Sequence, residues 1–127
     1  MPTATGTFTV EMTGAESPQP DTVRADLTKT WSGELAGTST GVMLSAGDAT
    51  TGSAGYVAIE VFTGSVNGAE GGFAFLQLAT MHAGDPRMTY VISPGSGTGE
   101  LAGITGTLDL DIVDGEHRVG LEYTLGG

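Results

Sequence analysis

The fold is decided by the stretch 55–66, which reads Gly-Tyr-Val-Ala-Ile-Glu-Val-Phe-Thr-Gly-Ser-Val. Two kinds of side chain alternate along it with a period of two, which is typical of a β-strand whose faces meet different surroundings. In its central part, one face carries aromatic, small and acidic side chains and the other carries β-branched ones: Tyr56, Ala58, Glu60 and Phe62 on the first, Val57, Ile59 and Val61 on the second. The pair Asn67-Gly68 follows and favours a tight turn into another strand.

The same period recurs along most of the chain and predicts about eight strands. They cover residues 4–12, 23–33, 38–46, 55–66, 72–81, 88–93, 104–113 and 116–125. No segment between them has the length and apolar spacing of a helix, so we expect an all-β fold. Loops are expected at residues 14–22, 46–54, 82–87 and 94–97, and Asp114-Gly115 predicts a type I′ hairpin turn.

A weak internal repeat indicates how the strands connect. The run Gly33-Glu34-Leu35-Ala36-Gly37 recurs at Gly99-Glu100-Leu101-Ala102-Gly103, and residues 64–68 have a similar form. We expect the pairs Ala36-Gly37, Asn67-Gly68 and Ala102-Gly103 at hairpin turns, where glycine accepts a positive φ. Hairpins in series favour a single eight-stranded antiparallel up-and-down β-barrel, with room for side chains or one small ligand. A two-sheet sandwich is the alternative that periodicity leaves open.

Length and composition restrict the classes of protein to which this chain can belong. A chain of 127 residues fits one domain spanning residues 1–127. Cysteine is absent, and no secretory pattern opens the chain, so we expect a cytoplasmic protein. No apolar run approaches the roughly 20 residues of a membrane helix. A formal net charge of -11 would repel phosphate backbones and anionic lipid, so neither nucleic acid nor membrane is an expected partner.

Four stretches of the sequence carry a family resemblance. They are Gly55-Tyr56-Val57-Ala58-Ile59-Glu60, the run Ser93-Pro94-Gly95-Ser96-Gly97-Thr98-Gly99-Glu100-Leu101-Ala102-Gly103, the closing Asp114-Gly115-Glu116-His117 with Tyr123, and the opening Thr5-Gly6-Thr7-Phe8. In these stretches the chain resembles a bacterial family known as domain of unknown function 3224. The resemblance implies an eight-stranded, calycin-like barrel similar to allene oxide cyclases, a superfamily that includes cofactor-free cyclases and dirigent proteins. Related barrels are often dimers or trimers, so a homo-oligomer is expected.

The chain departs from that family's pattern at two places. Leu76-Gln77 stands where members often carry Gln-His, and Val61 stands where they often carry Arg. Both departures remove ionisable groups. An activity that depends on those groups would be lost here or retuned to a more apolar ligand.

Two charged residues are the candidate catalytic groups. We favour the aromatic and acidic face of residues 55–66 as the lumen side, which places Glu60 inside the barrel. Lys29 shares its own strand face with Leu27 and Trp31, so it is expected inside as well. An unpaired buried charge is costly, so the two are expected to pair across the lumen. Glu60 is then a general acid or base tuned by Lys29, half of a buried structural ion pair, or, with Lys29, one of two side chains that reach solvent at the rim.

Aromatic and amphipathic residues on the same strand faces are the candidate substrate-binding set. Besides Tyr56 and Phe62, they are Trp31, Phe73, Phe75, Gln77, Met81 and Tyr90. Such residues either wall a pocket, with Gln77 and Tyr90 supplying hydrogen bonds, or form ordinary core. His82 and His117 lack the spacing of a metal site, and neither metal nor cofactor is expected.

The leading functional hypothesis is a cofactor-free isomerase or cyclase acting on a small, largely apolar, natural-product-like molecule. A closed barrel would hold a flexible molecule in a reactive conformation and exclude water. Two alternatives are a barrel that binds a small molecule without turnover and a structural protein that works through a subunit interface.

Overall fold

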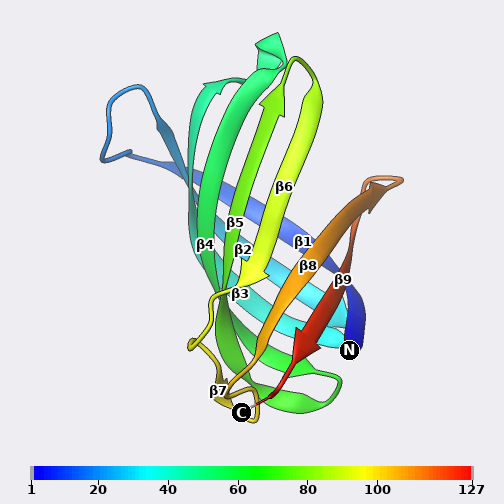
Figure 1. The fold of residues 1–127 in the computed structure, drawn as a ribbon. Coiled ribbons are helices and arrows are strands. Elements are labelled where there is room, and N and C mark those ends of the chain that lie inside the picture. The colour runs from blue at the N-terminus through cyan, green and yellow to red at the C-terminus, as the bar shows by residue number, and fades with distance from the viewer. Residues whose placement is uncertain (1, 127) are drawn as a thin grey trace.

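The computed structural model describes residues 2–126 as a β-barrel (Figure 1). The elements in chain order are β1 (Thr3–Ala15), β2 (Val23–Gly33), β3 (Leu35–Asp48), the 3₁₀ turn η1 (Ala49–Thr51), β4 (Ser53–Val66), β5 (Ala69–His82), β6 (Asp85–Ile92), β7 (Thr98–Gly99), β8 (Thr105–Val113) and β9 (Glu116–Thr124). Eight strands close into an antiparallel barrel in the order β1-β2-β3-β4-β5-β6-β8-β9, and β9 pairs back to β1. The two-residue β7 adds to one side of β5.

The predicted barrel is therefore confirmed over the sandwich, and each predicted strand is present. Three of the four loops are shorter than the sequence predicted, and the loop predicted at residues 94–97 is present between β6 and β7. Most of the expected loop 46–54 is strand, because β3 and β4 stay paired up to Asp48 and Ser53 on either side of η1. The expected loop 82–87 is reduced to Ala83-Gly84, because His82 already pairs with Asp85. Strand pairing satisfies the backbone N–H and C=O groups of these residues, whereas composition alone predicts turns for the same segments.

Of the three turns predicted from the repeat, only Asn67-Gly68 joins two paired strands, with φ values of 49° and 86°. Ala36-Gly37 lies inside β3, where Gly37 faces Gly64 so closely that an added Cβ would lie 2.2 Å from the Thr63 carbonyl oxygen. Ala102-Gly103 lies between β7 and β8, which do not pair with each other in the described chain.

The repeat instead builds the same clamp twice at one end of the barrel. The Glu34 amide donates to the Thr5 carbonyl at 2.9 Å, and Glu34 Oε1 accepts from the Thr5 amide at 2.9 Å. The Glu100 amide donates to the Glu70 carbonyl at 2.8 Å, and Glu100 Oε1 accepts from the Glu70 amide at 3.1 Å. Each glutamate is followed by a fully buried leucine. The repeated sequence therefore clamps a neighbouring strand and seals the barrel.

That sealed end, which also holds the described ends of the chain, is the closed end of the barrel (Figure 1). Its interior is filled by buried apolar side chains, and the segment between β7 and β8 contributes Leu101 and Ile104 as a plug. Four aromatic rings, Trp31, Phe62, Phe73 and Phe75, pack on one another in the middle with centroid distances of 4.9 to 6.4 Å. This half of the lumen is therefore packed with side chains.

The opposite end, the open end, is formed by the hairpins β1–β2, β3–β4, β5–β6 and β8–β9 (Figure 1). β6 and β8 share one paired position, Val91 with Thr107, and the two strands splay apart above it. Within residues 2–126, no helix is long and apolar enough to cross a bilayer.

Candidate functional site

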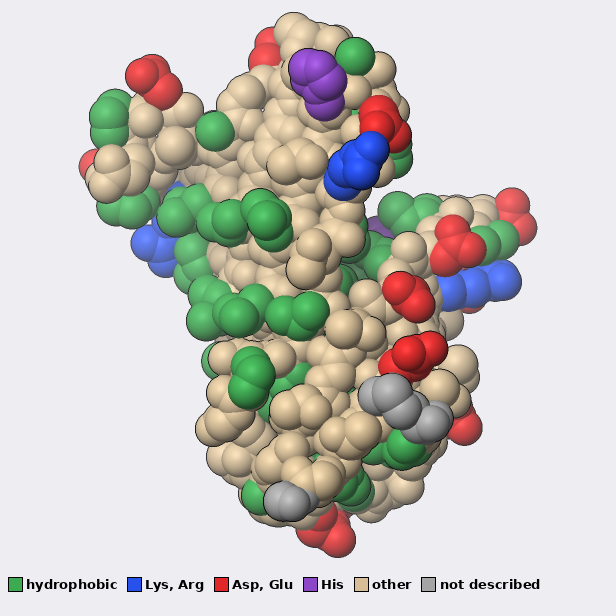
Figure 2. Space-filling model, in the orientation of Figure 1, with side chains coloured by type: hydrophobic (Ala, Val, Ile, Leu, Met, Phe, Trp, Pro, Cys, Tyr) green, Lys and Arg blue, Asp and Glu red, His purple; other side chains and the backbone are tan. Residues whose placement is uncertain are grey.

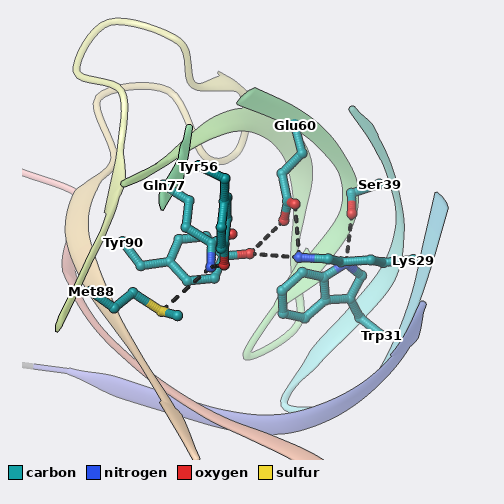
Figure 3. A network of polar contacts seen from close by, with 8 residues as sticks. All are labelled: Lys29, Trp31, Ser39, Tyr56, Glu60, Gln77, Met88 and Tyr90. Carbon is teal, nitrogen blue, oxygen red and sulfur yellow. Dashed lines mark hydrogen bonds and ion pairs between the residues drawn. The ribbon is translucent and has the colours of Figure 1, made fainter. Parts of the chain in front are cut away.

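A polar network crosses the lumen where the packed half meets the open half (Figure 3). Glu60 on β4 lies opposite Lys29 on β2, with Glu60 Oε2 2.8 Å from Lys29 Nζ. The Tyr90 hydroxyl on β6 donates to Glu60 Oε1 at 2.6 Å and accepts from Lys29 Nζ at 3.0 Å. The three residues are 2 to 5% exposed, so this triad is shielded from solvent.

Aromatic rings surround the Lys29 ammonium. Its Nζ lies 4.4 Å from the ring centroid of Phe8, 5.3 Å from that of Tyr90 and 5.5 Å from that of Trp31. Glu60 Oε2 receives no aligned hydrogen bond from any described residue, although it is buried. The charge of Lys29 is therefore what compensates this oxygen.

The triad fixes the protonation of Tyr90. Burial raises the pKa of the Tyr90 phenol well above its usual value, and the neighbouring Glu60 carboxylate raises it further by charge repulsion and by accepting the phenol proton. Tyr90 therefore stays a neutral donor to Glu60 through the physiological range.

Local sequence makes room for the triad. Gly41 on β3 pairs with Glu60, and a Cβ at Gly41 would lie 2.7 Å from the Glu60 Cβ. Ser39, two residues away on the same face, accepts from Trp31 Nε1 at 2.9 Å, which satisfies the indole beside the lysine. Small residues on β3 thus let the larger groups of β2 and β4 meet.

A cavity of about 120 Å³, the lumen cavity, lies in the barrel at the level of the triad and toward the open end. Side chains from every barrel strand except β6 line it: Phe8, Val10, Met12, Leu27, Lys29, Met43, Tyr56, Gln77, Leu110 and His117. A larger hollow of about 480 Å³, the mouth, opens beside it between the hairpins and shares Tyr56 and Leu110 in its wall. Neither wall contains a carboxylate, although the chain has 15 acidic residues.

Exposed apolar side chains ring the open end. Met12, Val23, Met88 and Ile112 belong to the inward-facing rows of β1, β2, β6 and β8, yet they are 47 to 64% exposed because they lie beyond the packed interior. An apolar rim of this kind favours an apolar molecule approaching the lumen.

Tyr56 and Gln77 stand between the mouth and the lumen cavity. Gln77 Nε2 donates to the Tyr56 hydroxyl at 2.6 Å and to Met88 Sδ at 3.4 Å. No hydrogen bond from the Tyr56 hydroxyl proton to a described residue is present, so this donor is available to a ligand. Burial raises the pKa of Tyr56, partly offset by the Gln77 hydrogen bond, so this hydroxyl also keeps its proton.

The structure divides the sequence-predicted site residues into three groups. Lys29, Tyr56, Gln77 and Met81 line the lumen cavity or the mouth. Glu60 and Tyr90 lie behind Lys29 in the triad. The aromatic residues Trp31, Phe62, Phe73 and Phe75 are packed in the core and line neither space.

Other residues of the cavity wall were not among the site residues predicted from the sequence, although the sequence carried a signal for them. Phe8, Val10 and Met12 share the inward face of β1, and His117 heads the inward row of β9 and stacks on Phe8 at 4.8 Å. Period-two alternation identifies these rows but does not tell which end of a row remains open. Among residues 2–126, no cluster of His, Asp and Glu has the arrangement of a metal site.

The residues that depart from the family pattern lie on both faces of the barrel sheet. Val61 and Leu76 point outward and are 56% and 38% exposed, whereas Gln77 points into the lumen. The expected lumen face of β4 is confirmed, since Ala58, Glu60 and Phe62 are buried while Val57 and Ile59 are exposed.

Comparisons with known proteins agree with this architecture. The family model described as "Protein of unknown function (DUF3224)" matches residues 4–123. A crystal structure of a protein with unknown function from the DUF3224 family of Shewanella oneidensis MR-1 is 36% identical, with a TM-score of 0.92 over 100% of this chain and 99% of that one. No curated protein matches the chain.

Proposed function

Since the chain belongs to the DUF3224 family, whose description assigns no activity, we propose from the site itself that the protein binds a small, largely apolar molecule in the open half of its barrel. The observation that carries this proposal is the lumen cavity, which is sealed on one side by packed aromatic rings and opens on the other to an apolar rim. Sites for small molecules are typically concave and mostly apolar, with a few convergent polar groups.

The polar groups define what the ligand would present. Tyr56 offers a hydroxyl donor at the passage between mouth and lumen cavity, and Gln77 holds its orientation. A ligand with an apolar body and one hydrogen-bond acceptor fits this arrangement, because an unpaired buried donor would cost about 1–3 kcal/mol.

Titration calorimetry with small apolar alcohols and ketones, including geraniol and menthone, tests the proposal. Saturable binding is expected, with a change in the emission of Trp31, the single tryptophan, because Phe8 of the cavity wall packs on it at 4.7 Å. Leu110→Trp should abolish binding by filling the passage, while Thr9→Trp on the outer face of β1 should leave it unchanged. Absence of binding across the panel, or unaltered binding by Leu110→Trp, would reject a lumen site.

The second candidate is a cofactor-free isomerase or cyclase working in the same cavity. It is favoured by a specific observation, the ionisable triad in the water-poor wall of the lumen cavity. Lys29 lines the cavity and would stabilise negative charge developing on a substrate oxygen. Glu60 lies behind it and would act as a positioning residue that holds the ammonium in place.

Turnover separates the two candidates. Each ligand found by calorimetry would be incubated with the protein, and isomeric products sought by chromatography and mass spectrometry. Under the second candidate, the Lys29→Met/Glu60→Gln double variant should still bind while product formation falls by at least tenfold. If the unaltered protein binds a ligand but forms no product from it, the second candidate is rejected and the binding function remains.

A further inference from the structure

The outer surface of β3 to β6 is a second apolar feature, separate from the lumen. Residues that face outward on these four neighbouring strands form three rows across the sheet, because paired residues lie side by side. The rows are Val42, Ile59, Leu76 and Val91; Leu44, Val57, Leu78 and Thr89; and Thr40, Val61 and Ala74. We call these residues the outer apolar face.

The outer apolar face is exposed and uncharged. Val57, Ile59 and Val61 are 51 to 56% exposed, and Leu78 is 52% exposed. The rows contain no charged residue, in a chain with 15 acidic and four basic ones. Figure 2 shows bands of hydrophobic side chains across this surface, with acidic side chains at the hairpin ends and over β8. An apolar patch of this kind on a protein surface is often functional, so we infer that it is an interface.

The size of the face fits the centre of a standard interface. Strands lie about 4.8 Å apart and alternate residues about 6.8 Å apart, so three rows over four strands cover roughly 300 Å² of sheet. With a polar rim, this is comparable to the apolar centre of an interface that buries about 800 Å² on each partner.

Shape and charge favour a second copy of the same chain as the occupant. Two sheets pack face to face at about 30° when their twists match, and two copies of one sheet have the same twist. Each copy carries a net charge of -11, so two copies repel least when they meet through a face without charges. An anionic membrane surface is disfavoured by that net charge.

We propose that two copies associate through the outer apolar face, related by a twofold axis that crosses β4 and β5. In such an isologous interface the same residues meet from both sides. The interface would also cover the outside of the wall that holds Glu60 and Gln77, since Ile59, Val61, Leu76 and Leu78 flank those residues in sequence. This proposal does not depend on ligand binding in the lumen.

Sedimentation equilibrium provides the first test. The unaltered protein is expected at twice the 12.8 kDa chain mass, and the Ile59→Lys variant at the chain mass itself. The variant should keep the circular dichroism spectrum of the unaltered protein and should unfold on heating as a folded monomer does. Thr9→Lys makes the same charge change at an exposed outward position on β1 and should remain a dimer. A monomeric unaltered protein, or an Ile59→Lys protein that stays dimeric, would overturn the proposal.

Single cysteines provide the second test, because the chain has none of its own. A disulfide in a single-cysteine variant must join two copies through the same residue, which requires Cβ atoms about 3.5–4.5 Å apart at a twofold axis. Under mild oxidation, one or two of the variants Val42→Cys, Ile59→Cys, Leu76→Cys and Val91→Cys should give a covalent dimer, and Thr9→Cys should not. Cross-linking at Thr9→Cys alone, or a trimeric mass in sedimentation, would contradict the twofold face-to-face arrangement.

Discussion

Lys29 and Glu60 are charged residues placed in a lumen that is otherwise aromatic and aliphatic. Each is stable there because the other is present, at 2.8 Å, and because Tyr90 bonds to both. Taking one charge away leaves the other buried without compensation, whereas taking both away leaves an uncharged interior. The pair therefore makes a definite prediction about stability.

The Glu60→Gln variant should lose about 3–5 kcal/mol of unfolding free energy, because the Lys29 ammonium is left buried without a counter-charge. Urea unfolding monitored by Trp31 emission measures the loss. The Lys29→Met/Glu60→Gln double variant should recover most of it. A double variant as unstable as the two single losses added together would show that the residues do not act as a pair.

Tyr90 predicts a loss of stability in alkali. Its pKa in the fold is raised by burial and then by Glu60, so above pH about 10 the folded state retains a proton that the unfolded state has released. The contribution of Tyr90 to the free energy of unfolding is therefore fully present below pH about 10. Above that pH, the free energy of unfolding should fall by up to about 1.4 kcal/mol per pH unit.

The measurement is urea unfolding at several values between pH about 9 and about 11, where Tyr90→Phe should show a shallower decline than the unaltered protein. Tyr56, whose pKa is also raised, keeps a residual slope in the variant. Identical slopes in both proteins would mean that Tyr90 titrates as an ordinary phenol.

At the scale of single residues, sequence alternation predicted which side of the sheet a side chain occupies but not how deep in the barrel it lies. It placed Lys29 and Glu60 in the same lumen, because a period of two fixes which face a residue occupies. It could not separate Tyr56 and Gln77, which line the cavity, from Phe62 and Phe73, which are packed core. That division depends on depth along the barrel axis, which alternation does not encode.

Among the elements, β6 and β8 form the weak seam of the barrel. Apart from Val91 with Thr107, their facing edges are not paired in the described structure, whereas β4 and β5 pair from Ala54 to Val66. Unpaired edge groups depend on solvent, and such segments open locally at low free-energy cost.

Backbone amide hydrogen exchange should therefore be faster in β6, over Asp85–Ile92, and in the part of β8 nearer the open end, than in the centres of β4 and β5. Mass spectrometry of peptic fragments would measure it, and a ligand that fills the lumen should slow exchange at the seam. Uniform protection around the barrel would show that the seam does not open more readily than the rest.

The repeated Gly-Glu-Leu-Ala-Gly sequence shows what element-level reasoning can and cannot recover. Glycine content correctly indicated special backbone geometry, since Gly33 and Gly99 have φ values of 115° and 62°. The turn interpretation was wrong for Ala36-Gly37 and did not give a hairpin at Ala102-Gly103, because the repeat clamps a neighbouring strand through Glu34 and Glu100. A hydrogen bond to a distant strand leaves no local pattern in the sequence.

For the whole molecule, the net charge of -11 predicts how association responds to salt. Two acidic copies repel each other, and raising the ionic strength from about 0.01 M to about 0.5 M shortens the screening length from about 30 Å to below 10 Å. The proposed dimer should therefore dissociate less at high salt, with apolar burial unaffected. Sedimentation velocity across a salt series tests this, and weaker association at high salt would indicate an interface held by charge pairs instead.

The sequence by itself determined the all-β class and the side of each strand that turns inward, because both follow from the local geometry of an extended chain. Only the tertiary structure decided that Lys29 and Tyr90, 61 positions apart, meet at Glu60, and that half of the lumen is packed while half is open. Distances across a barrel depend on the number of strands and on their stagger, which are properties of the closed sheet. The closed sheet also decided that the β-branched face of β4, which the sequence had favoured as the outer one, lies bare, with Val57, Ile59 and Val61 51 to 56% exposed.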